Sequence, residues 1–273
     1  MTGTFAGKLV LVTGGGRGTG RQITLSFAKQ GADMLVNCFR EPEAAEETVR
    51  EVIAGGGRAQ LLPCDIADRT LVTAMFTQIA QRHGRLDILV NNAASGRFNP
   101  ADAIRERDWQ RALSTNAAGP LWCAQAARPL LEQSQHPAIV NVSSSGAGSV
   151  LPAYTGLGAS KAALEALTRY LAVEYGPAGI RVNAASGGLI KGHARAGMLD
   201  NVRLDAAARA AAPLRRLGTP DELAQVVLFL ASPAASWITG QVIHADGGLS
   251  ITHPAYASMM AQTIKGDEGS QPS

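Results

Sequence analysis

A short apolar segment runs directly into a cluster of glycines near the start of the chain, and this pairing constrains the fold most. Leu9–Val12 has the composition of a β-strand that is buried on both faces, as in a parallel sheet. The glycines follow as Gly14-x-x-x-Gly18-x-Gly20, a spacing that differs from the G-x-G-x-x-G fingerprint, and a helical pattern comes next. A strand, loop and helix of this kind directs backbone N–H groups at a phosphate. We therefore expect a nucleotide site here; the alternative is a plain turn.

The rest of the chain alternates apolar, strand-like segments with helical ones. The further strands are expected at 34–37, 61–65, 87–90, 138–142, 180–184 and 242–245. This alternation predicts a single doubly wound, Rossmann-type α/β domain with a parallel, seven-stranded sheet flanked by helices. Ligands bind such sheets at the carboxyl ends of the strands. We expect this domain over residues 1–249, with a substrate lid at about 189–216 and a C-terminal extension over 250–273.

Composition excludes several classes of protein. The chain has 273 residues, of which 46% are apolar, and this suffices for one sizeable core. No apolar stretch approaches about 18 residues and no secretory signal is visible, so we expect a cytoplasmic protein without a membrane partner. The net charge of +3 argues neither for nor against a charged partner, and we expect no nucleic acid. The three cysteines are widely spaced and form no metal pattern, as in a reducing cytosol.

Tyr154 and Lys161 form the feature that points most directly to chemistry. Seven residues at 100° each return almost to the same helix face two turns away, so Tyr154 can share a face with Lys161. A nearby ammonium favours the phenolate, lowers the tyrosine pKa and makes the two residues an acid–base pair. The alternative is a buried aromatic residue beside a solvated lysine. Position 157, four residues before Lys161, is a leucine that can do no chemistry.

The second predicted strand ends without the acidic residue that NAD-selective sites use to hold the ribose 2′-OH. Arg40 follows it, and Arg17 lies in the glycine loop. Together they are suited to hold a 2′-phosphate, which predicts NADPH; the alternative is two surface arginines. Asp65, at the exit of the third strand, is expected near the adenine. Asn116 lies between two helical stretches, where it holds a water, kinks the helix or caps it.

Several of these motifs, in this order, resemble those of the short-chain dehydrogenase/reductases over about residues 8–248. They are the glycine loop, Asn91-Asn92-Ala93, Asn116, Ser144, Lys161 and Asp246-Gly247-Gly248. The usual pattern of that family is Tyr-x-x-x-Lys, which would need a tyrosine at position 157. The pattern found, Tyr154-x6-Lys161, is similar to that of enoyl-acyl-carrier-protein reductases, and residues 91–96, 160–174 and 182–188 look most like the NADPH-dependent type III enzymes.

This resemblance implies a set of site residues. The implied catalytic residues are Tyr154, Lys161, Ser144 and Asn116. The implied contacts to NADPH are Gly14, Gly16, Arg17, Gly18, Thr19, Gly20, Arg40, Cys64, Asp65, Ile66, Asn92, Ala93, Ala94, Lys161, Gly187, Gly188 and Ile190. Many enoyl reductases carry a second tyrosine at the position of Ser144, whereas this chain keeps the serine of the wider family. The resemblance also implies a homotetramer that pairs the long helix after Tyr154 with its symmetry mate.

A tyrosine three positions earlier on a helix is displaced by about 4.5 Å along the axis. That displacement suits the enolate oxygen formed when hydride adds to the β-carbon of an enoyl thioester. We therefore predict NADPH-dependent reduction of the C2–C3 double bond, with Tyr154 stabilising the enolate and Lys161 holding the nicotinamide ribose. The alternatives are a carbonyl reductase that reuses Tyr154 and a catalytically silent nucleotide-binding protein. The lid segment has six basic and two acidic residues, which suits an acidic acyl carrier protein.

Overall fold

The computed structural model describes residues 3–192 and 201–253, and these residues contain one parallel sheet of seven strands. The strand order is β3-β2-β1-β4-β5-β6-β7, which confirms the predicted doubly wound α/β domain. The strands are β1 (Leu9–Val12), β2 (Asp33–Cys38), β3 (Arg58–Pro63), β4 (Ile88–Asn91), β5 (Ala138–Ser144), β6 (Arg181–Gly187) and β7 (Val242–Ala245). The order reverses between β1 and β4, where a doubly wound sheet opens a ligand crevice.

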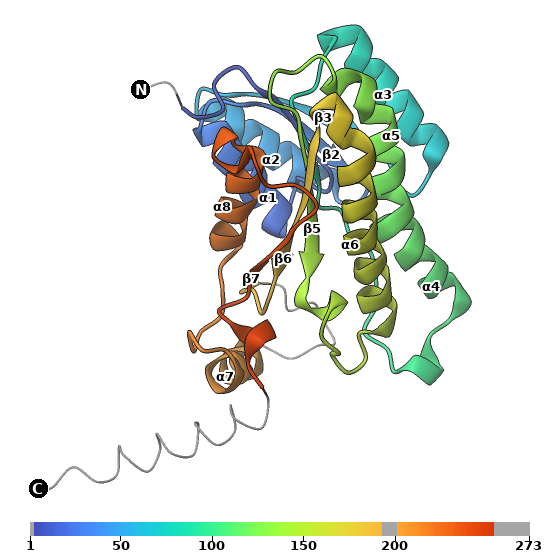
Figure 1. Cartoon of the computed structure of the whole chain (residues 1–273), viewed down its shortest axis with the longest axis vertical. Helices are drawn as coiled ribbons and strands as arrows, with labels where there is room; N and C mark the ends of the chain where they lie inside the picture. Colours follow the sequence, from blue (N-terminus) through green and yellow to red (C-terminus); the bar gives the residue numbers. More distant parts are fainter. Residues whose placement is uncertain (1–2, 193–200, 254–273) are drawn as a thin grey trace, which may run out of the picture.

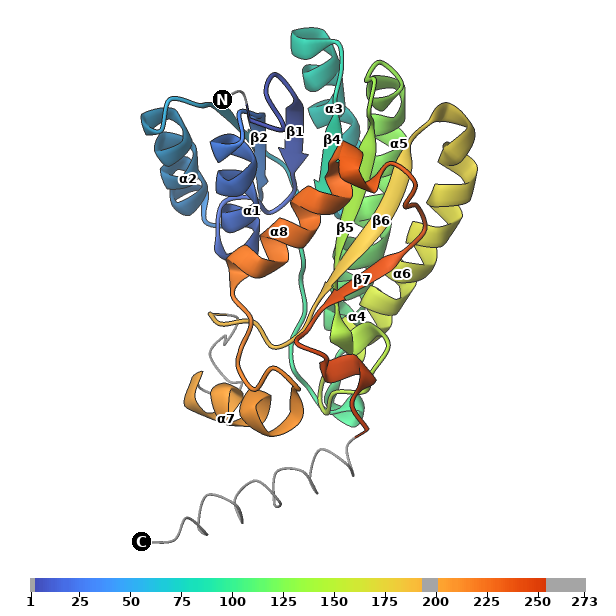
Figure 2. The ribbon, with the colours of Figure 1, turned by 60° about the vertical axis from the view of Figure 1, so that its left-hand side comes forward.

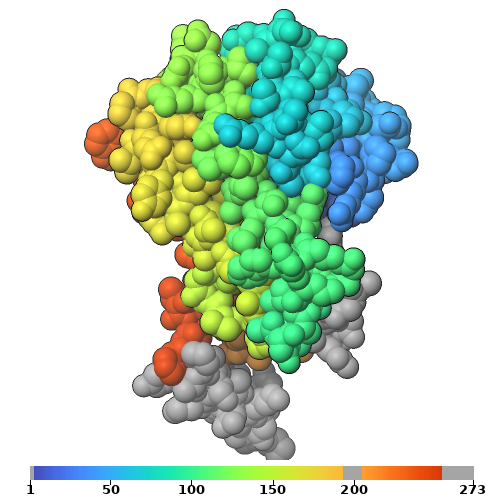
Figure 3. Space-filling view, turned by 90° about the vertical axis from the view of Figure 1, so that its right-hand side faces the viewer, coloured from blue at the N-terminus to red at the C-terminus, as the bar shows by residue number. Residues whose placement is uncertain are grey.

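Helices cover both faces of the sheet and make three layers (Figure 1, Figure 2). One face is covered by α1 (Gly18–Lys29), α2 (Pro42–Ala54) and α8 (Pro220–Ala231). The opposite face carries α3 (Arg69–His83), α4 (Glu106–Leu113), α5 (Gly119–Leu131) and α6 (Thr155–Tyr175), and Figure 3 shows this side from outside. The remaining α-helix of the described residues, α7 (Asn201–Ala211), lies beyond the carboxyl ends of the strands.

Alternation along the short strands explains why both faces are covered. In β1, Leu9 and Leu11 join the core under α3, α5 and α6, whereas Val10 and Val12 join the core under α1 and α8. Successive side chains of a strand point to opposite faces, so a strand made only of apolar residues needs two apolar partners. The continuous apolar pattern read from the sequence is therefore the consequence of burial on both sides.

Local signals fix where individual helices begin. The Asp68 carboxylate accepts hydrogen bonds from the backbone N–H groups of Thr70 and Leu71 and caps α3. Thr219 and Glu222 form a reciprocal capping box at the start of α8. Of the predicted lid, residues 193–200 lie outside the described part of the chain, as do residues 254–273 of the predicted extension. No helix in the described ranges is long and apolar enough to cross a membrane.

Candidate active site

The carboxyl end of β5 and the start of α6 bring Tyr154 and Ser144 together. Ser144 is the last residue of β5, and Tyr154 is the N-cap residue of α6. The Tyr154 Oη donates a hydrogen bond to the Ser144 Oγ at 3.1 Å. Burial raises the pKa of the Tyr154 phenol, and the hydrogen bond with Ser144 opposes this more weakly. Tyr154 is therefore a neutral phenol and a hydrogen-bond donor.

The Tyr154 ring is positioned by an aromatic ring and a glycine. The ring centroid of Phe98, in the segment after β4, lies 5.1 Å from that of Tyr154. A Cβ added to Gly146 would come within 2.5 Å of the Tyr154 Cε1, so only glycine leaves room for the ring. Ala153, directly before the tyrosine, has a left-handed backbone with φ of 60°, and its carbonyl accepts the N–H of Asn99 at 2.9 Å. These contacts hold both the Tyr154 ring and the backbone directly before it.

Lys161 is buried near the end of the second turn of α6, which excludes the alternative of a solvated lysine. Its Nζ donates to the carbonyl oxygen of Val142 at 2.6 Å. Burial lowers the pKa of Lys161 to about 8, and the nearby Glu165 carboxylate opposes this shift. The prediction that Lys161 lowers the pKa of Tyr154 is wrong here, because burial of the phenol is the dominant effect and raises its pKa.

Asn116 lies in a single π-helical turn, Ser114–Ala118, that joins α4 to α5. Its Oδ1 accepts the backbone N–H of Ser95 at 2.8 Å, and its Nδ2 donates to the Ser95 carbonyl and to the Ser160 Oγ, both at 2.9 Å. Of the roles left open by the sequence, the structure shows an interrupted helix rather than a cap. Asn116 connects the segment after β4 to α6, the helix that carries Lys161.

Leu157 occupies the position where the usual family pattern has tyrosine, and its side chain is packed rather than catalytic. It is buried at 9% exposure. A Cβ added to Gly96 would meet the Leu157 Cγ at 2.3 Å, which shows how closely the leucine contacts that backbone. The phenol of Tyr154 is the one that reaches Ser144.

The glycine loop between β1 and α1 has the backbone that its sequence predicts. Gly14 and Gly18 have φ of 61° and 53°, in the left-handed region that favours glycine. A Cβ on Gly20 would lie 2.1 Å from the Gly14 carbonyl oxygen, so no side chain fits at the turn into α1. Asn92 holds the loop through its Nδ2, which donates to the carbonyls of Thr13 at 2.9 Å and Gly14 at 3.1 Å.

The start of α1 fits a dinucleotide pyrophosphate. Its N-cap residue, Arg17, makes no side-chain cap, and no acidic residue lies in the first turn. The positive end of the helix is therefore not neutralised by the protein itself. A Cβ on Gly18 would meet nothing within 4 Å, so the loop is open on that side. A phosphate is the group that such a cradle holds.

The arginines expected at a 2′-phosphate have different surroundings. The exposed Arg17 forms an ion pair with Glu41, the N-cap residue of α2. Arg40 lies two residues after the end of β2, with its guanidinium carbon 5.9 Å from the centre of the Phe39 ring. Among the described residues, Arg40 forms no ion pair, so its charge is available to an anion.

Asp65, expected near the adenine, is bound by Arg111 of α4. The two side chains form two hydrogen bonds of 2.7 and 3.0 Å. Burial acts to raise the pKa of the Asp65 carboxyl, but the bonds from Arg111 and from the N–H of Ala67 outweigh it and hold that pKa below its usual range. The Arg111 guanidinium carbon also lies 5.4 Å from the Phe39 ring centre. Asp65, Arg111, Phe39 and Arg40 thus form one cluster at the β2–β3 edge.

The other predicted cofactor contacts lie at or near strand ends. Cys64 and Ile66 are buried in the core under α3 and α5, so only their backbone is placed to meet a ligand. Gly187 ends β6, and the Gly188 N–H donates to the Ala245 carbonyl of β7 at 3.2 Å. The remaining members of the set are Gly16 in the glycine loop, Thr19 in the first turn of α1, Ala93 and Ala94 after β4, and Ile190, which pairs with Gly218.

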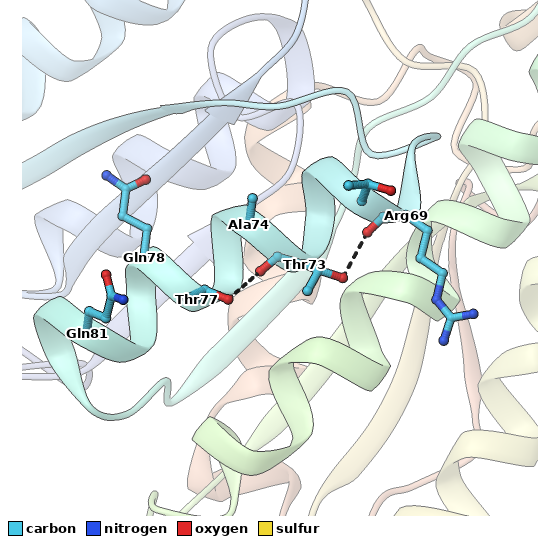
Figure 4. Close-up of a pocket in the computed structure, with 7 residues that line it drawn as sticks. Arg69, Thr73, Ala74, Thr77, Gln78 and Gln81 are labelled. Atoms are coloured by element: carbon cyan, nitrogen blue, oxygen red, sulfur yellow. Dashed lines mark hydrogen bonds between the residues drawn. The ribbon is translucent and has the colours of Figure 1, made fainter.

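A surface depression elsewhere is not part of this constellation. It follows the outer side of α3 and is lined by Arg69, Thr70, Thr73, Ala74, Thr77, Gln78 and Gln81 (Figure 4). The hydroxyls of Thr73 and Thr77 are directed to carbonyls of the helix itself, at 3.0 and 2.9 Å. No predicted site residue lines it.

Sequence reasoning missed residues that support the site. Thr13 accepts the N–H groups of Asn92 and Ala93 at 3.0 and 3.1 Å, and the Asn37 Oδ1 accepts the Gly14 N–H at 3.3 Å. Polar residues at the ends of otherwise apolar strands were the available signal for Thr13 and Asn37. No signal in the sequence indicated Phe98, because its contact with Tyr154 depends on how the segment after β4 returns to α6.

A doubly wound parallel sheet with a glycine loop, a Tyr–Ser pair and a buried lysine is typical of nucleotide-dependent oxidoreductases. Residues 14–250 match the family described as "Enoyl-(Acyl carrier protein) reductase". The chain belongs to the short-chain dehydrogenase/reductase family.

The names of two similar proteins each contain an acyl thioester as the substrate. The chain is 36% identical over 270 residues to 1-cyclohexenylcarbonyl-CoA reductase of Streptomyces collinus, covering 94% of this chain and 92% of the relative. It is also 36% identical over 242 residues to the 3-oxoacyl-[acyl-carrier-protein] reductase FabG of Staphylococcus aureus, covering 89% and 98%. The first name describes an enoyl-type reductase and the second a carbonyl reductase, so identity alone does not choose between them.

Two solved structures show the same fold with different cofactors. A gluconate 5-dehydrogenase from Burkholderia cenocepacia in complex with NADP and tartrate superposes with a TM-score of 0.85 at 30% identity, covering 90% of this chain and 96% of that one. A 7α-hydroxysteroid dehydrogenase complexed with NADH and 7-oxo glycochenodeoxycholic acid gives 0.84 at 33% identity, covering 89% and 94%. The choice of cofactor therefore rests on this chain's own residues.

Proposed function

We propose that this protein reduces the C2–C3 double bond of an enoyl thioester with NADPH. One observation carries the proposal: Tyr154, and not residue 157, supplies the phenol that contacts Ser144, while Leu157 is packed against Gly96. A donor three positions earlier than usual suits an oxygen farther from the carbon that accepts hydride. The similarity to 1-cyclohexenylcarbonyl-CoA reductase supports the same chemistry.

The residues have separate tasks in this proposal. NADPH, when bound, supplies the hydride that adds to C3 of the substrate. Tyr154 donates a hydrogen bond to the thioester carbonyl oxygen, where negative charge collects as the enolate forms, and its raised pKa keeps the proton available. Ser144 orients that phenol, and Lys161 places a positive charge beside the nicotinamide ribose. A proton from water then adds at C2 and completes the saturated thioester.

A second candidate is the reduction of a 3-oxoacyl or other carbonyl group. It is favoured by Ser144, which keeps the serine of the wider family and accepts a hydrogen bond from Tyr154, and by the similarity to FabG. A catalytically silent nucleotide-binding protein is the third candidate. Its one supporting feature is Leu157.

The decisive experiment follows NADPH oxidation with crotonyl and acetoacetyl thioesters side by side. Faster turnover of the crotonyl thioester supports the proposal, whereas faster turnover of the acetoacetyl thioester supports carbonyl reduction. Binding of NADPH without turnover of either supports the silent protein. Each acyl group is offered on acyl carrier protein, on coenzyme A and on N-acetylcysteamine, because the carrier-bound arm tests the proposed acidic partner.

Ion pairs offset part of the positive charge of the predicted lid. Arg209 pairs with Asp205, and Arg216 pairs with Glu222 of α8.

Gly146→Ala should lower kcat about tenfold or more, because the new Cβ displaces the Tyr154 ring and small misplacements of a catalytic group are costly. NADPH affinity should change little. Gly148→Ala is the matched control, since a Cβ there meets nothing within 4 Å. Steady-state kinetics and NADPH titration of both variants test this. Equal activity of the two variants would show that the ring position does not matter.

The rate should fall above about pH 8, because the buried Lys161 loses its proton there and its positive charge with it. Glu165→Gln should move this fall to lower pH, since the Glu165 carboxylate raises the pKa of Lys161. The measurement is kcat/KM against pH for both proteins. A break at the same pH in the variant would assign it to another group.

We also propose a homotetramer. Tyr170 and Val173 lie three residues apart on α6 and are 70% and 77% exposed, as expected of a helix face that meets another chain. This helix runs along the face seen in Figure 3. Light scattering at micromolar concentration should give about four times the 28.4 kDa of one chain. A monomeric mass would refute the assembly, and Val173→Glu should reduce the mass if α6 forms the contact.

A further inference from the structure

The ion pair between Arg17 and Glu41 joins the glycine loop to the start of α2, and Arg17 is one of the two arginines proposed to hold the 2′-phosphate. Arg17 is the N-cap residue of α1, and Glu41 is the N-cap residue of α2 and directly follows Arg40. The two side chains bond to each other although both are about half exposed. We propose that Glu41 is a specificity-determining residue that competes with the 2′-phosphate for Arg17; this rests on the proposed use of NADPH.

The backbone on both sides of this pair is fixed, so only the side chains are free to exchange partners. A Cβ added to Gly16 would lie 2.5 Å from the Ala45 Cβ, which places the glycine loop directly on α2. The Thr48 hydroxyl of α2 donates to the Gly16 carbonyl at 2.9 Å. The loop and helix therefore hold Arg17 and Glu41 within reach of each other. An anion that binds Arg17 from between them must displace the Glu41 carboxylate.

The conformation of Glu41 is itself unusual. It has φ of 58° and ψ of 59°, a left-handed backbone that is strained for a residue other than glycine. Pro42 follows and disfavours the right-handed helical conformation for Glu41, so α2 begins immediately after it. In this conformation the Glu41 carboxylate pairs with Arg17, and the Glu41 carbonyl oxygen accepts the N–H of Ala45 at 3.4 Å.

The charges determine whether Glu41 strengthens or weakens the binding of NADPH relative to NADH. A 2′-phosphate carries negative charge that Glu41 opposes and that Arg17 and Arg40 attract. With Glu41 bound to it, Arg17 is partly neutralised, so NADPH has to replace one anion by another. NADH has a neutral 2′-hydroxyl and leaves the pair intact. Glu41 therefore narrows the preference for NADPH over NADH that the two arginines create.

A second ion pair tests whether this pair has only a structural role. Arg21 of α1 pairs with Glu51 of α2, one helical turn farther from the glycine loop. Its exposed fractions, 36% and 48%, are close to the 44% and 53% of Arg17 and Glu41. Both pairs join the same two helices, but only the first lies at the glycine loop. Glu51→Gln is thus a matched control for Glu41→Gln.

The experiment measures dissociation constants of NADPH and NADH by fluorescence titration, without turnover. Glu41→Gln should tighten NADPH binding roughly two- to fivefold, the upper part of the range expected for a partly exposed charge pair, and should leave NADH binding nearly unchanged. Glu51→Gln should change neither. In an Arg17→Ala background, the gain from Glu41→Gln should be largely lost, because the carboxylate then has no arginine to compete for.

The outcomes separate this inference from the proposed function. If the unaltered protein binds neither nucleotide, the proposed NADPH chemistry fails. If it binds NADPH and Glu41→Gln changes nothing, or changes both nucleotides alike, Glu41 does not set specificity. An equal gain with and without Arg17 would also overturn competition, since it would leave only a general charge effect. Thermal unfolding of each variant confirms that the fold is retained.

Discussion

Tyr154→Phe should lower turnover about 10²-fold or more, the usual scale for loss of a positioned acid or oxyanion donor. The phenylalanine keeps the ring against Phe98 and above Gly146, so the fold around α6 should be retained. Only the hydroxyl that bonds to Ser144 is removed. The measurement is kcat with the better of the crotonyl and acetoacetyl thioesters, together with the dissociation constant of NADPH.

Tyr170→Phe is the control for this substitution. Tyr170 lies on the same helix, nine residues after Lys161 and thus far from the Tyr154 hydroxyl, so removal of its own hydroxyl should leave kcat unchanged. NADPH affinity should stay within about twofold of the original in both variants, because neither phenol lies at the glycine loop. Full activity of Tyr154→Phe would remove Tyr154 from the mechanism and would leave Ser144 as the residue to test next.

The double substitution Arg17→Ala and Arg40→Ala should weaken NADPH binding about 10- to 100-fold, which corresponds to about 0.7 to 1.4 kcal/mol for each solvent-screened contact between an arginine and the phosphate. NADH should lose much less, because it has no 2′-phosphate. The result is best expressed as the ratio of the two dissociation constants. This prediction depends on Arg40 being free of ion pairs within the described structure and on Arg17 exchanging Glu41 for the phosphate.

Arg21→Ala provides the matched comparison. Arg21 lies on α1 one turn after Arg17 and pairs with Glu51, so it carries the same charge at a similar exposure. Its loss should leave the NADPH-to-NADH ratio unchanged. If all three arginines alter the ratio equally, the effect is one of general surface charge, and a specific phosphate contact is excluded.

Much of the fold follows from local patterns in the chain. Short apolar strands alternate with helical segments, and burial of each strand on both faces requires the three layers observed. The glycine loop was predictable for a similar reason, since Gly14 and Gly18 need a left-handed backbone. The two helices predicted around Asn116 are joined in the structure, because a π-helical turn continues one into the other.

The sequence by itself determined the sheet, the phosphate cradle and the spacing of Tyr154 from Lys161, because each depends on residues close together along the chain. Tertiary structure alone decided which groups those residues meet. Tyr154 contacts Ser144, Lys161 bonds to Val142, and their pKa values follow from burial rather than from each other. Glu41 likewise reaches Arg17 only because α2 packs on the glycine loop. Partners far apart in sequence, and the desolvation they share, are properties of packing that no local pattern encodes.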